Sequence, residues 1–422
     1  MAHILMAIRN LTGGGAERMV LWTTAGLEDR GHRVDIAIFD PTIAYTVNLP
    51  SQARLMILCG QSKSARWQPD TLPKQAYWRS ERIPLVRTVS PIAKLVARYG
   101  IRCLTVFPQP RVLEWACRLA HYFEHEQPDI VFGNLGHSEF AALLGVRMAF
   151  VQEARPPVVS IQHLGLKSGT SYARYVRCLS AEFAHHVTVS HAVAESLSST
   201  CHVPEEKITT IHNPVDLTSI ARQAAAPTDH PWFSDGGPPV ILSAGRLEPR
   251  KEFFTLLDAF HILRRSGHDC RLLVLGEGVL RGALEDRVQA LGLEDQVSLP
   301  GWVENPFSYM SRSALFVLAS RWEGFGMVLA EAMACGCPAV ATDCPGPPEI
   351  LQDPDLLAPV GDPDALAQVM LRVLNRPRNR EEMRAKSAQF SVERCAAAYE
   401  TLIARVLAEA KSQECKANRH SS

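Results

Sequence analysis

The sequence lacks any apolar run near the roughly 18 residues that cross a bilayer, which excludes a membrane-spanning helix. Its first residues, MAHILMAIRN, show no basic head, long apolar region or small-residue cleavage site, so we expect no signal peptide. None of its 11 cysteines forms a CxxC pair, and Cys335 and Cys337 do not have metal-ligand spacing. We therefore expect reduced core cysteines in a cytoplasmic protein that is at most peripheral on the inner face of the cell membrane.

An excess of charge and two nucleotide-binding signatures are also absent. Lys plus Arg and Asp plus Glu are equal at 44 each, which gives no general reason to expect a nucleic-acid partner. Neither a GK[ST] P-loop nor a GxGxxG fingerprint occurs, which argues against a P-loop ATPase and against an NAD enzyme. Any electrostatic function must therefore be local.

What the sequence does contain is a repeated alternation of short runs rich in Val, Ile and Leu with longer segments of helical period. This pattern indicates parallel sheets with helical crossovers, so the fold class is α/β, with two Rossmann-like doubly wound parallel-sheet domains facing across a cleft. A stretch rich in Pro, Ala, Asp and Gly separates the halves. We expect an N-terminal domain at 1–214, a linker at 215–239, a C-terminal domain at 240–400, and a helix end with a polar tail at 401–422.

Twelve strands are expected from these runs, each followed by turn residues or helical sequence. They are placed at 3–8, 33–39, 53–58, 129–134, 158–163, 186–190, 207–211, 240–245, 271–275, 296–299, 314–319 and 338–342. After about Asp362 the pattern is helical only, and the terminal KSQECKANRHSS is too polar to order itself by burial.

The segment RWEGFGMVLAE at 321–331 carries the strongest chemical signal. The glycines Gly324 and Gly326, with Phe325 between them, form a turn from a strand into a helix, where free N–H groups and the positive helix end suit a phosphate. Glu323 and Glu331 bracket this turn, and their spacing suits two parts of one elongated ligand such as a nucleotide sugar. The alternative makes Glu323 a helix-capping acid and Glu331 a solvated helix residue.

A second strand-to-helix loop, GRLEPRK at 245–251, concentrates cations. Arg246, Arg250 and Lys251 have almost no acidic counterweight beyond Glu248. A guanidinium fork matches phosphate oxygens and an ammonium is a mobile point charge, so this loop can neutralise a departing diphosphate. The alternative is a solvated helix start.

Further loops fall at strand ends in both halves. Gly276 and Gly278 follow a strand and bring backbone close to a nucleotide, and a glycine run that includes Gly14 and Gly15 opens the first helix at a site suited to an anion or a reacting sugar. His163 closes the strand VVSIQH, either as a ligand contact or as a structural cap.

Asp-Pro-Asp occurs twice, at 353–355 and 362–364, and suggests paired carboxylates for a cation. Both copies lie in turns before helices, where Asp-Pro is ordinary N-cap chemistry. We therefore expect no metal site and no cofactor.

Together these segments resemble the retaining GT-B glycosyltransferases of family 4, also called glycosyl transferases group 1. The hallmark of that family is Glu, seven residues, Glu, matched here by EGFGMVLAE, with GRLEPRK and TDCPGPPEIL in the same half. The N-terminal half shows GGGAERM, PDIVFGN, SIQH, TVSHAV and IHNPVD in the family's order. The resemblance covers nearly the whole chain.

The resemblance implies an N-terminal acceptor domain, a C-terminal nucleotide-sugar domain, and a role for each motif residue. Glu331 would bind the donor ribose, Glu323 the sugar hydroxyls, Arg246 and Lys251 the diphosphate, and His163 the transferred sugar. Gly14 and Gly15 would border the anomeric carbon of that sugar, and the loops with Gly276, Gly278, Gly324, Phe325 and Gly326 would hold the donor.

The reaction implied is transfer of a hexose or N-acetylhexosamine from a nucleotide-diphosphate sugar to a glycan or polyprenyl-diphosphate-linked acceptor. It would retain the anomeric configuration, need no metal, and serve cell-surface polysaccharide or glycoconjugate biosynthesis. Two alternatives remain open: a GT-B-fold sugar-nucleotide epimerase and a non-catalytic subunit that binds a nucleotide sugar.

A basic segment at 63–118 suggests one more partner. It holds 11 Lys or Arg against three acids, an excess of eight, and includes Trp67, Tyr77 and Trp78. This composition suits an anionic membrane surface. The alternative is a solvated helical face.

Overall fold

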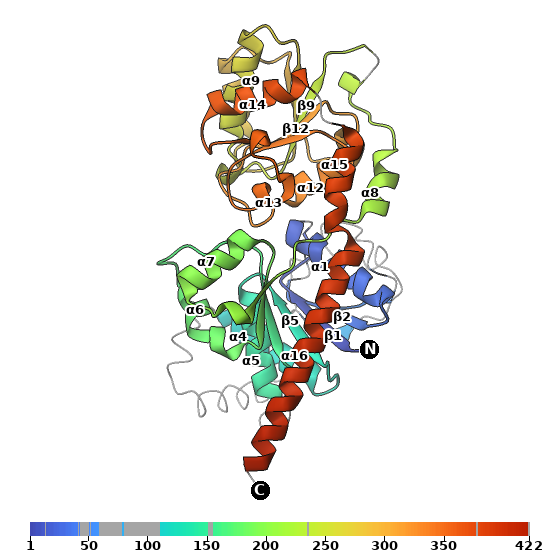
Figure 1. Cartoon of the computed structure of the whole chain (residues 1–422), viewed down its shortest axis with the longest axis vertical. Coiled ribbons are helices and arrows are strands. Elements are labelled where there is room, and N and C mark those ends of the chain that lie inside the picture. The colour runs from blue at the N-terminus through green and yellow to red at the C-terminus, as the bar shows by residue number, and fades with distance from the viewer. Residues whose placement is uncertain are drawn as a thin grey trace. The chain divides into compact units, whose positions relative to one another are not determined.

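The computed structural model describes residues 1–12, 14–40, 42, 50, 52–58, 78–79, 110–150, 155–233, 236–376 and 379–420. The chain forms two compact units, drawn in Figure 1. Unit 1 comprises Met1–Val189, Val193–His212 and Val392–Ser422, and unit 2 comprises Ser190–Ala192 and Asn213–Ser391. Each unit is built on its own sheet.

Unit 1 contains an eight-stranded sheet in the order β4-β3-β2-β1-β5-β6-β7-β8, with every pair of neighbours parallel. Continuous apolar runs form its central strands because both faces of such a sheet are covered. The strands are β1 His3–Ile8, β2 Arg33–Ile38, β3 Arg54–Ile57, β4 Trp78–Arg79, β5 Ile130–Asn134, β6 Val158–Gln162, β7 His185–Thr188 and β8 Ile208–Thr210.

Helices connect these strands, and α4 and α5 pack on each other over the core of unit 1. The order of strands changes direction between β1 and β5, which is where open α/β sheets place ligands, outside the carboxyl ends of the strands. The helices are α1 Gly15–Asp29, α4 Pro110–Phe123, α5 His137–Ala149, α6 Ser171–Leu179, α7 His191–Cys201 and α16 Val392–His420, with 3₁₀ turns at Ser180–Glu182 and Glu205–Lys207.

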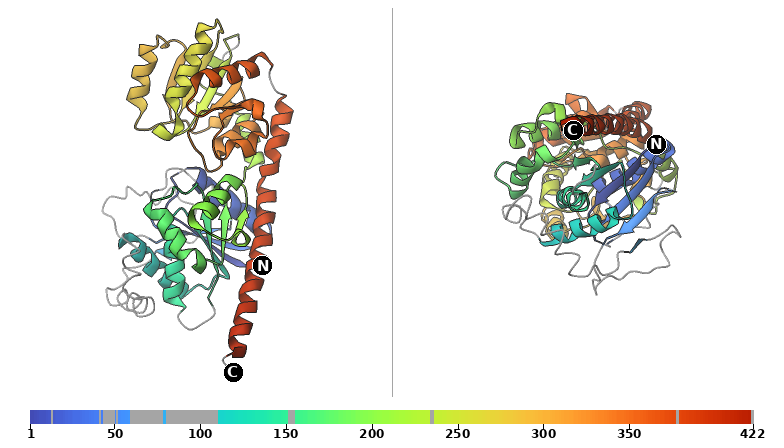
Figure 2. Two further views of the ribbon diagram at one scale, coloured as in Figure 1. Left: turned by 60° about the vertical axis from the view of Figure 1, so that its left-hand side comes forward. Right: turned by 90° about the horizontal axis from the view of Figure 1, so that it is seen from below.

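The long helix α16 returns to unit 1 and runs along one side of it beside α1 (Figure 2). Gly26 of α1 permits this close packing, because a Cβ there would lie 2.8 Å from Val392 Cγ1 and from Ala396 Cβ. The expected boundary of the C-terminal domain at residue 400 is therefore wrong, since residues 392–400 belong to unit 1. The polar tail from Lys411 also continues as helix to His420, contrary to expectation.

Unit 2 contains a six-stranded parallel sheet in the order β11-β10-β9-β12-β13-β14. Its strands are β9 Val240–Ala244, β10 Arg271–Leu275, β11 Val297–Gly301, β12 Leu315–Leu318, β13 Ala339–Thr342 and β14 Leu357–Ala358. Its helices are α8 Leu217–Ala224, α9 Phe253–Arg265, α10 Arg281–Ala290, α11 Pro306–Met310, α12 Met327–Ala334, α13 Pro347–Leu351, α14 Pro363–Asn375 and α15 Arg380–Ser387. Short 3₁₀ turns lie at Pro231–Phe233, Pro249–Lys251, Pro354–Leu356 and Ala388–Phe390.

The expected linker at 215–239 is instead part of unit 2. Its helix α8 packs on α11 and α12, and Asn305 Nδ2 donates to Gln223 O at 2.8 Å. Val215 N also donates to Phe390 O at 2.7 Å, so the residues where the chain enters and leaves unit 2 are bonded to each other. The fold class is confirmed, and each of the twelve expected strands overlaps an observed strand.

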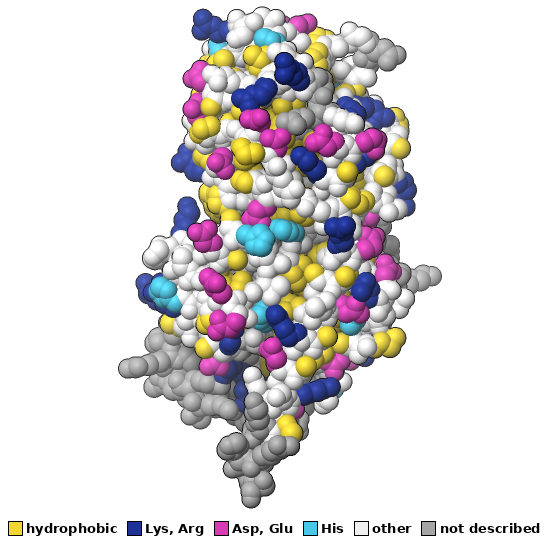
Figure 3. Space-filling model, in the orientation of Figure 1, with side chains coloured by type: hydrophobic (Ala, Val, Ile, Leu, Met, Phe, Trp, Pro, Cys, Tyr) yellow, Lys and Arg dark blue, Asp and Glu magenta, His cyan; other side chains and the backbone are white. Residues whose placement is uncertain are grey.

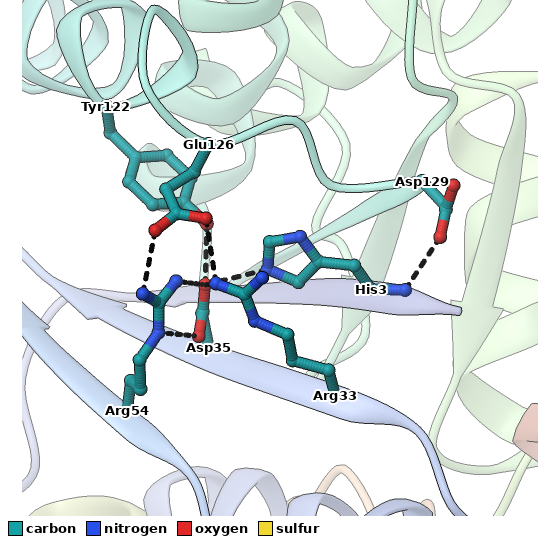
Figure 4. Close-up of polar contacts among 7 residues, drawn as sticks. All are labelled: His3, Arg33, Asp35, Arg54, Tyr122, Glu126 and Asp129. Carbon is teal, nitrogen blue, oxygen red and sulfur yellow. Dashed lines mark hydrogen bonds and ion pairs between the residues drawn. The ribbon is translucent and has the colours of Figure 1, made fainter. Parts of the chain in front are cut away.

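A buried ion-pair network joins the first three strands of unit 1 at their amino ends (Figure 4). Asp35 Oδ2 is fully buried and accepts from His3 Nε2 at 2.7 Å, Arg54 Nη2 at 2.5 Å and Tyr122 Oη at 2.8 Å. Burial alone would raise the pKa of Asp35, but these three donors outweigh burial and hold the pKa well below its usual value. Glu126 accepts from the same Arg54 at 2.7 Å, so the network locks the strand ends together.

The surface of the described residues carries mixed charge. On the face shown in Figure 3, Lys and Arg side chains are interspersed with Asp and Glu. No helix within the described ranges is both long and apolar enough to cross a membrane. Most of the basic segment at 63–118 lies outside the described residues, so its membrane role stays a prediction.

Candidate active site

Two strand-to-helix loops of unit 2 meet because β9 and β12 are neighbours in the sheet. The loop after β9 contains Gly245, Arg246 and the 3₁₀ turn Pro249–Lys251, and the loop after β12 contains Glu323 and the Gly324–Gly326 turn. Since parallel strands end at the same edge, both motifs expected to bind a diphosphate lie together.

Glu323 is the centre of this cluster and is only 7% exposed. Lys251 Nζ donates to its Oε1 at 2.6 Å, Ser320 Oγ donates to the same oxygen at 2.6 Å, and Arg250 Nη1 donates to Oε2 at 3.2 Å. Burial alone would raise the pKa of Glu323, but Lys251 and Arg250 outweigh it and hold the pKa below its usual value. The Glu323 carboxylate thus holds Lys251 and Arg250 in place, and the three groups together carry a net charge of +1.

Arg246 differs from this pair because its side chain is 65% exposed. Its Nη1 donates to Glu248 Oε1 at 3.0 Å, an exposed contact of the kind that contributes little to stability. The guanidinium of Arg250 instead lies 4.9 Å from the centre of the Trp322 ring, which adds a cation–π contact. Arg246 can therefore turn toward a ligand at low energetic cost, whereas Arg250 and Lys251 are held in place.

Gly276 and Gly278 have a packing role that the sequence did not reveal. A Cβ at Gly276 would lie 2.0 Å from Gly245 O, and a Cβ at Gly278 would lie 2.4 Å from Leu247 O. Leu247 N also donates to Glu277 O at 2.9 Å. The loop after β10 is therefore pressed against the cation loop backbone to backbone, and contact of its glycines with a ligand stays a prediction.

The turn at 324–326 enters helix α12 through Gly326, which caps the helix with φ 98° and offers no side chain to the first-turn N–H groups. Glu323 is not the capping acid of the alternative interpretation, since it pairs with Lys251. Glu331 in α12 is 0% exposed, so it is not a solvated helix residue either. Phe325 is buried and packs edge-on against Phe390 at 5.1 Å, so only its backbone is available to a ligand.

In unit 1, the expected anion loop leads into α1. Gly14 is the N-cap of this helix, and no side chain caps the first turn, which begins at Gly15. A Cβ at Gly14 would lie 2.5 Å from Glu17 Oε2, so a larger residue would displace that carboxylate. Gly13 lies outside the described residues.

His163 follows β6 and is 8% exposed. Its Nε2 lies 3.1 Å from Asn134 Oδ1, while Asn134 Nδ2 donates to Ala7 O at 3.3 Å. Because the Asn134 amide nitrogen is used, its oxygen accepts from His163 Nε2–H. Burial lowers the pKa of His163 to about 4, so at neutral pH the ring is uncharged and its Nδ1 is an acceptor for a hydroxyl.

Sequence reasoning missed a buried carboxyl beside His163. Glu139 of α5 is 0% exposed and accepts from Ser160, from Tyr172 and, at 2.9 Å, from Gln162 Nε2. Burial raises the pKa of Glu139 to about 7, although all three donors lower it. The available signal was an acid placed directly before the apolar run FAALLG at 140–145, because a carboxyl in a buried segment is rare.

The two Asp-Pro-Asp turns are helix caps, as expected. Asp353 Oδ1 accepts from Asp355 N at 3.0 Å, and Asp362 Oδ1 accepts from Ala365 N at 2.9 Å. A different set of metal-type ligands, His3, Asp35 and Glu126, lies within one cluster, but Arg54 already binds both of its carboxylates. The expected independence from metal and cofactor stays a prediction.

Comparison with known proteins places these loops in a family. The model for Glycosyltransferase Family 4 matches residues 13–219, and the model for Glycosyl transferases group 1 matches residues 228–390. A Campylobacter jejuni N-acetylgalactosamine-N,N'-diacetylbacillosaminyl-diphospho-undecaprenol 4-alpha-N-acetylgalactosaminyltransferase is 36% identical over 35% of this chain and 38% of its own length. The Bacillus anthracis N-acetyl-alpha-D-glucosaminyl L-malate synthase is 29% identical over 52% of this chain and 60% of its own. The matched part of this chain thus spans less than two thirds of either relative.

Solved structures share the fold over nearly the whole chain. Anabaena Alr3699/HepE in complex with UDP and glucose aligns with a TM-score of 0.73 and 16% identity, covering 96% of this chain and 100% of that chain. Sucrose-phosphate synthase from Thermosynechococcus elongatus aligns with a TM-score of 0.68 and 19% identity, covering 97% and 100%. Since the two family models match consecutive halves of the sequence and both units are parallel-sheet α/β domains, the chain belongs to glycosyltransferase family 4 and has the GT-B fold.

Proposed function

We propose that this glycosyltransferase moves a hexose or N-acetylhexosamine from a nucleotide-diphosphate sugar to a glycan or lipid-linked acceptor, with retention of anomeric configuration. The observation that carries the proposal is the cluster of Lys251, Arg250 and Glu323 at the carboxyl edge of the unit 2 sheet. Its net positive charge, with the exposed Arg246 beside it in the same loop, suits a diphosphate.

We propose the following roles for the residues of the cluster, in line with the resemblance to the family. Arg246 and Lys251 bind the diphosphate, and Glu323 holds Lys251 at 2.6 Å while its carboxylate receives sugar hydroxyls. As the bond from the anomeric carbon to the phosphate oxygen breaks, negative charge grows on that oxygen and the sugar gains oxocarbenium character. Lys251 then stabilises the transition state more than the bound donor, which is the condition for raising turnover.

The other motif residues complete the proposed site. Glu331 binds the ribose, the loops with Gly276 and Gly278 hold the nucleotide, and Gly14 and Gly15 border the anomeric carbon. His163 accepts a hydroxyl of the transferred sugar at Nδ1, the atom left over by its bond to Asn134. Closure that excludes water favours transfer over hydrolysis.

Relatives support the substrate class. The Campylobacter relative is named as an N-acetylgalactosaminyltransferase acting on a diphospho-undecaprenol-linked sugar, and a Rhizobium meliloti relative as a lipopolysaccharide core biosynthesis glycosyltransferase. We extend both features to this chain: an N-acetylhexosamine donor and a lipid-linked or cell-surface glycan acceptor.

The test begins with thermal shift of the full-length protein against a panel of UDP-, GDP- and ADP-sugars, followed by product analysis with and without candidate acceptors. The proposal expects stabilisation by at least one nucleotide sugar and a glycoside product of unchanged anomeric configuration. Release of an isomerised sugar nucleotide without acceptor would instead identify an epimerase. Donor binding without any turnover would identify a non-catalytic subunit.

A matched pair of variants ties the activity to the cluster. Lys251→Ala removes the cation beside Glu323, whereas Arg287→Ala removes a cation of unit 2 that pairs with Asp258 at 2.6 Å, away from the cluster. Turnover should fall in Lys251→Ala and stay near wild type in Arg287→Ala. Equal activity of the two variants would refute the proposed site.

A further inference from the structure

The carboxyl-terminal turn of α4 brings two histidines and a glutamate together on one side of the helix. His121, Glu124 and His125 stand at positions i, i+3 and i+4 in the sequence HYFEH. Because residues three and four apart are neighbours on a helix surface, their side chains converge. One ligand atom from each residue lies within 4.8 Å of the other two. This turn therefore presents two imidazoles and one carboxylate as a group.

The distances within this group suit a single metal ion. Zinc binds imidazole nitrogen and carboxylate oxygen at about 2.0–2.2 Å, so two ligand atoms of one ion are at most roughly 4.4 Å apart. His121 Nδ1 lies 2.9 Å from Glu124 Oε2, and the ring centres of His121 and His125 are 5.1 Å apart. Since Glu124 and His125 are exposed, a small rotation of these two side chains closes the remaining gap.

The end of the helix favours a cation at this place. Glu124 N donates to Ala120 O and to His121 O, both at 3.2 Å. His125 N donates to Tyr122 O at 3.0 Å. The turn thus continues the helix, and the carbonyl end of a helix carries a partial negative charge that attracts cations.

The side chains between and after the three ligands are anchored in the core. Tyr122 Oη donates to the buried Asp35 at 2.8 Å, and Glu126 accepts from Arg54 at 2.7 Å (Figure 4). These two contacts fix the backbone that carries the histidines and the glutamate. A preorganised backbone lowers the entropy lost when the side chains close on an ion.

Neighbouring charges on the helix do not oppose a cation. Arg118 lies one turn before His121, and its Nη2 pairs with Glu114 Oε1 at 2.7 Å, so its charge is compensated. Glu124 adds a negative charge to the two imidazoles, which strengthens the attraction for a divalent ion.

The ligand types select the kind of metal. Imidazole suits zinc and other transition metals, whereas Mg²⁺ and Ca²⁺ prefer sites built from oxygen atoms. Two histidines at i and i+4 on one face have the spacing with which zinc-binding helices hold their ion. Zinc takes two nitrogens and one carboxylate oxygen as three protein ligands and water as the fourth.

We propose that His121, Glu124 and His125 form a zinc site on unit 1, with water as the fourth ligand. The site follows the end of α4 and adjoins the Asp35 network at the amino ends of the strands, whereas the proposed transferase residues lie at carboxyl ends. The bound ion fastens the last turn of α4 and takes no part in transfer. The inference therefore goes beyond the proposed function, and the expectation that turnover needs no metal is unchanged.

Zinc titration of the full-length protein, treated with EDTA and then freed of it, tests the site. A chromophoric zinc indicator competes for the ion at neutral pH and reports the number and affinity of the sites. His125→Asn should weaken one site by at least tenfold relative to wild type. His202→Asn is the matched control and should bind as wild type, because His202 is also exposed and Asn tolerates its positive φ of 58°. Equal zinc binding by the two variants would overturn the inference.

Hydrogen–deuterium exchange locates the ion in the same proteins. Where opening of the turn releases zinc, exchange slows by up to about 100-fold at a zinc concentration 100 times the dissociation constant. Peptides that contain residues 120–126 should show this slowing in wild type and in His202→Asn but not in His125→Asn, and Mg²⁺ should leave all three unchanged. Slowing of these peptides in none of the proteins, or equally in all three, refutes the site. Exchange without added metal serves as the check of folding.

Discussion

Replacing Glu139 by Gln should change how the stability of unit 1 depends on pH. Burial raises the pKa of Glu139 from 4.5 to about 7 in the folded protein. A raised carboxyl pKa contributes stability that is complete below the unfolded value and is lost as pH rises through the folded value. This raised pKa corresponds to roughly 3 kcal/mol of unfolding free energy, which is lost as pH rises from about 4.5 to about 7 and does not change further above that.

The hydrogen bonds around Glu139 explain why both the protonated and the ionised carboxyl are tolerated. When protonated, the Glu139 carboxyl donates to Tyr172, which then donates to Gln162 Oε1 at 3.1 Å. When ionised, it accepts from Tyr172, Ser160 and Gln162, and pays only the cost of burying charge. Gln at this position keeps the shape and removes the titration.

Histidines of the same unit titrate with the opposite sign and would hide the effect in wild type alone. Burial lowers the pKa of His163, His185 and His186 to about 4, so each contributes stability that is present above about pH 6.5 and is lost on acidification. Only the difference between wild type and Glu139→Gln isolates the carboxyl, because the three histidines are common to both.

Hydrogen–deuterium exchange of peptides from β5 and β6, measured from pH 5 to pH 8, provides the assay. The opening free energy of the variant should rise relative to that of wild type by roughly 2.5 kcal/mol across that range, because part of the total loss falls below pH 5, and comparison at equal pH cancels the intrinsic exchange rate. Glu206→Gln, at an exposed position, is the control and should show no trend. A difference between Glu139→Gln and wild type that does not vary with pH would refute the raised pKa.

Four other outcomes are expected. Lys251→Ala should lower turnover by about 10²–10³-fold with a smaller effect on donor binding, whereas Glu331→Ala should mainly weaken donor binding; equal loss of affinity in both contradicts this division. Activity should survive EDTA, and loss of activity that Mg²⁺ or Mn²⁺ restores would show that a metal is required. Asp35→Ala should destabilise unit 1 by about 3–5 kcal/mol in urea unfolding, because Arg54 is left without its buried partner; the contribution of Asp35 is present above about pH 3.8 and is lost on further acidification. Binding to anionic vesicles through 63–118 should fade as salt shortens the screening length from about 10 Å at 0.1 M to about 3 Å at 1 M, and equal pelleting with neutral vesicles would exclude it.

Sequence pattern predicted the strands and the loops well because both have local causes. A run such as VILSA at 240–244 is apolar on both faces, and the turn residues after it mark the carboxyl end where Arg246 and Lys251 lie. Neighbouring strands then bring Glu323 to the same place, although 72 residues separate it from Lys251. The local sequence pattern and the parallel order of the strands were therefore sufficient to predict that these residues lie at one edge of the sheet.

Features that depend on distant packing were not predictable in the same way. The helical period of 392–420 shows an apolar stripe but not which sheet it covers, so its return to α1 was missed. The burial of Glu139 depends on α4, α6 and β6 enclosing α5. The close contact of Gly278 with Leu247 likewise arises only when two loops are brought together by the sheet.

The return of α16 has a consequence for how the chain is made. Unit 2 is almost one continuous stretch, Asn213–Ser391, whereas unit 1 needs residues from both ends of the sequence. During synthesis from the N-terminus, all of unit 2 therefore leaves the ribosome before unit 1 receives its last helix. Until then the face of α1 around Gly26 lacks Val392 and Ala396, and its apolar side chains are open to water. A nascent chain stopped before residue 392 would thus carry a complete unit 2 beside an unfinished unit 1, and premature termination there would expose unit 1 to chaperones and proteases.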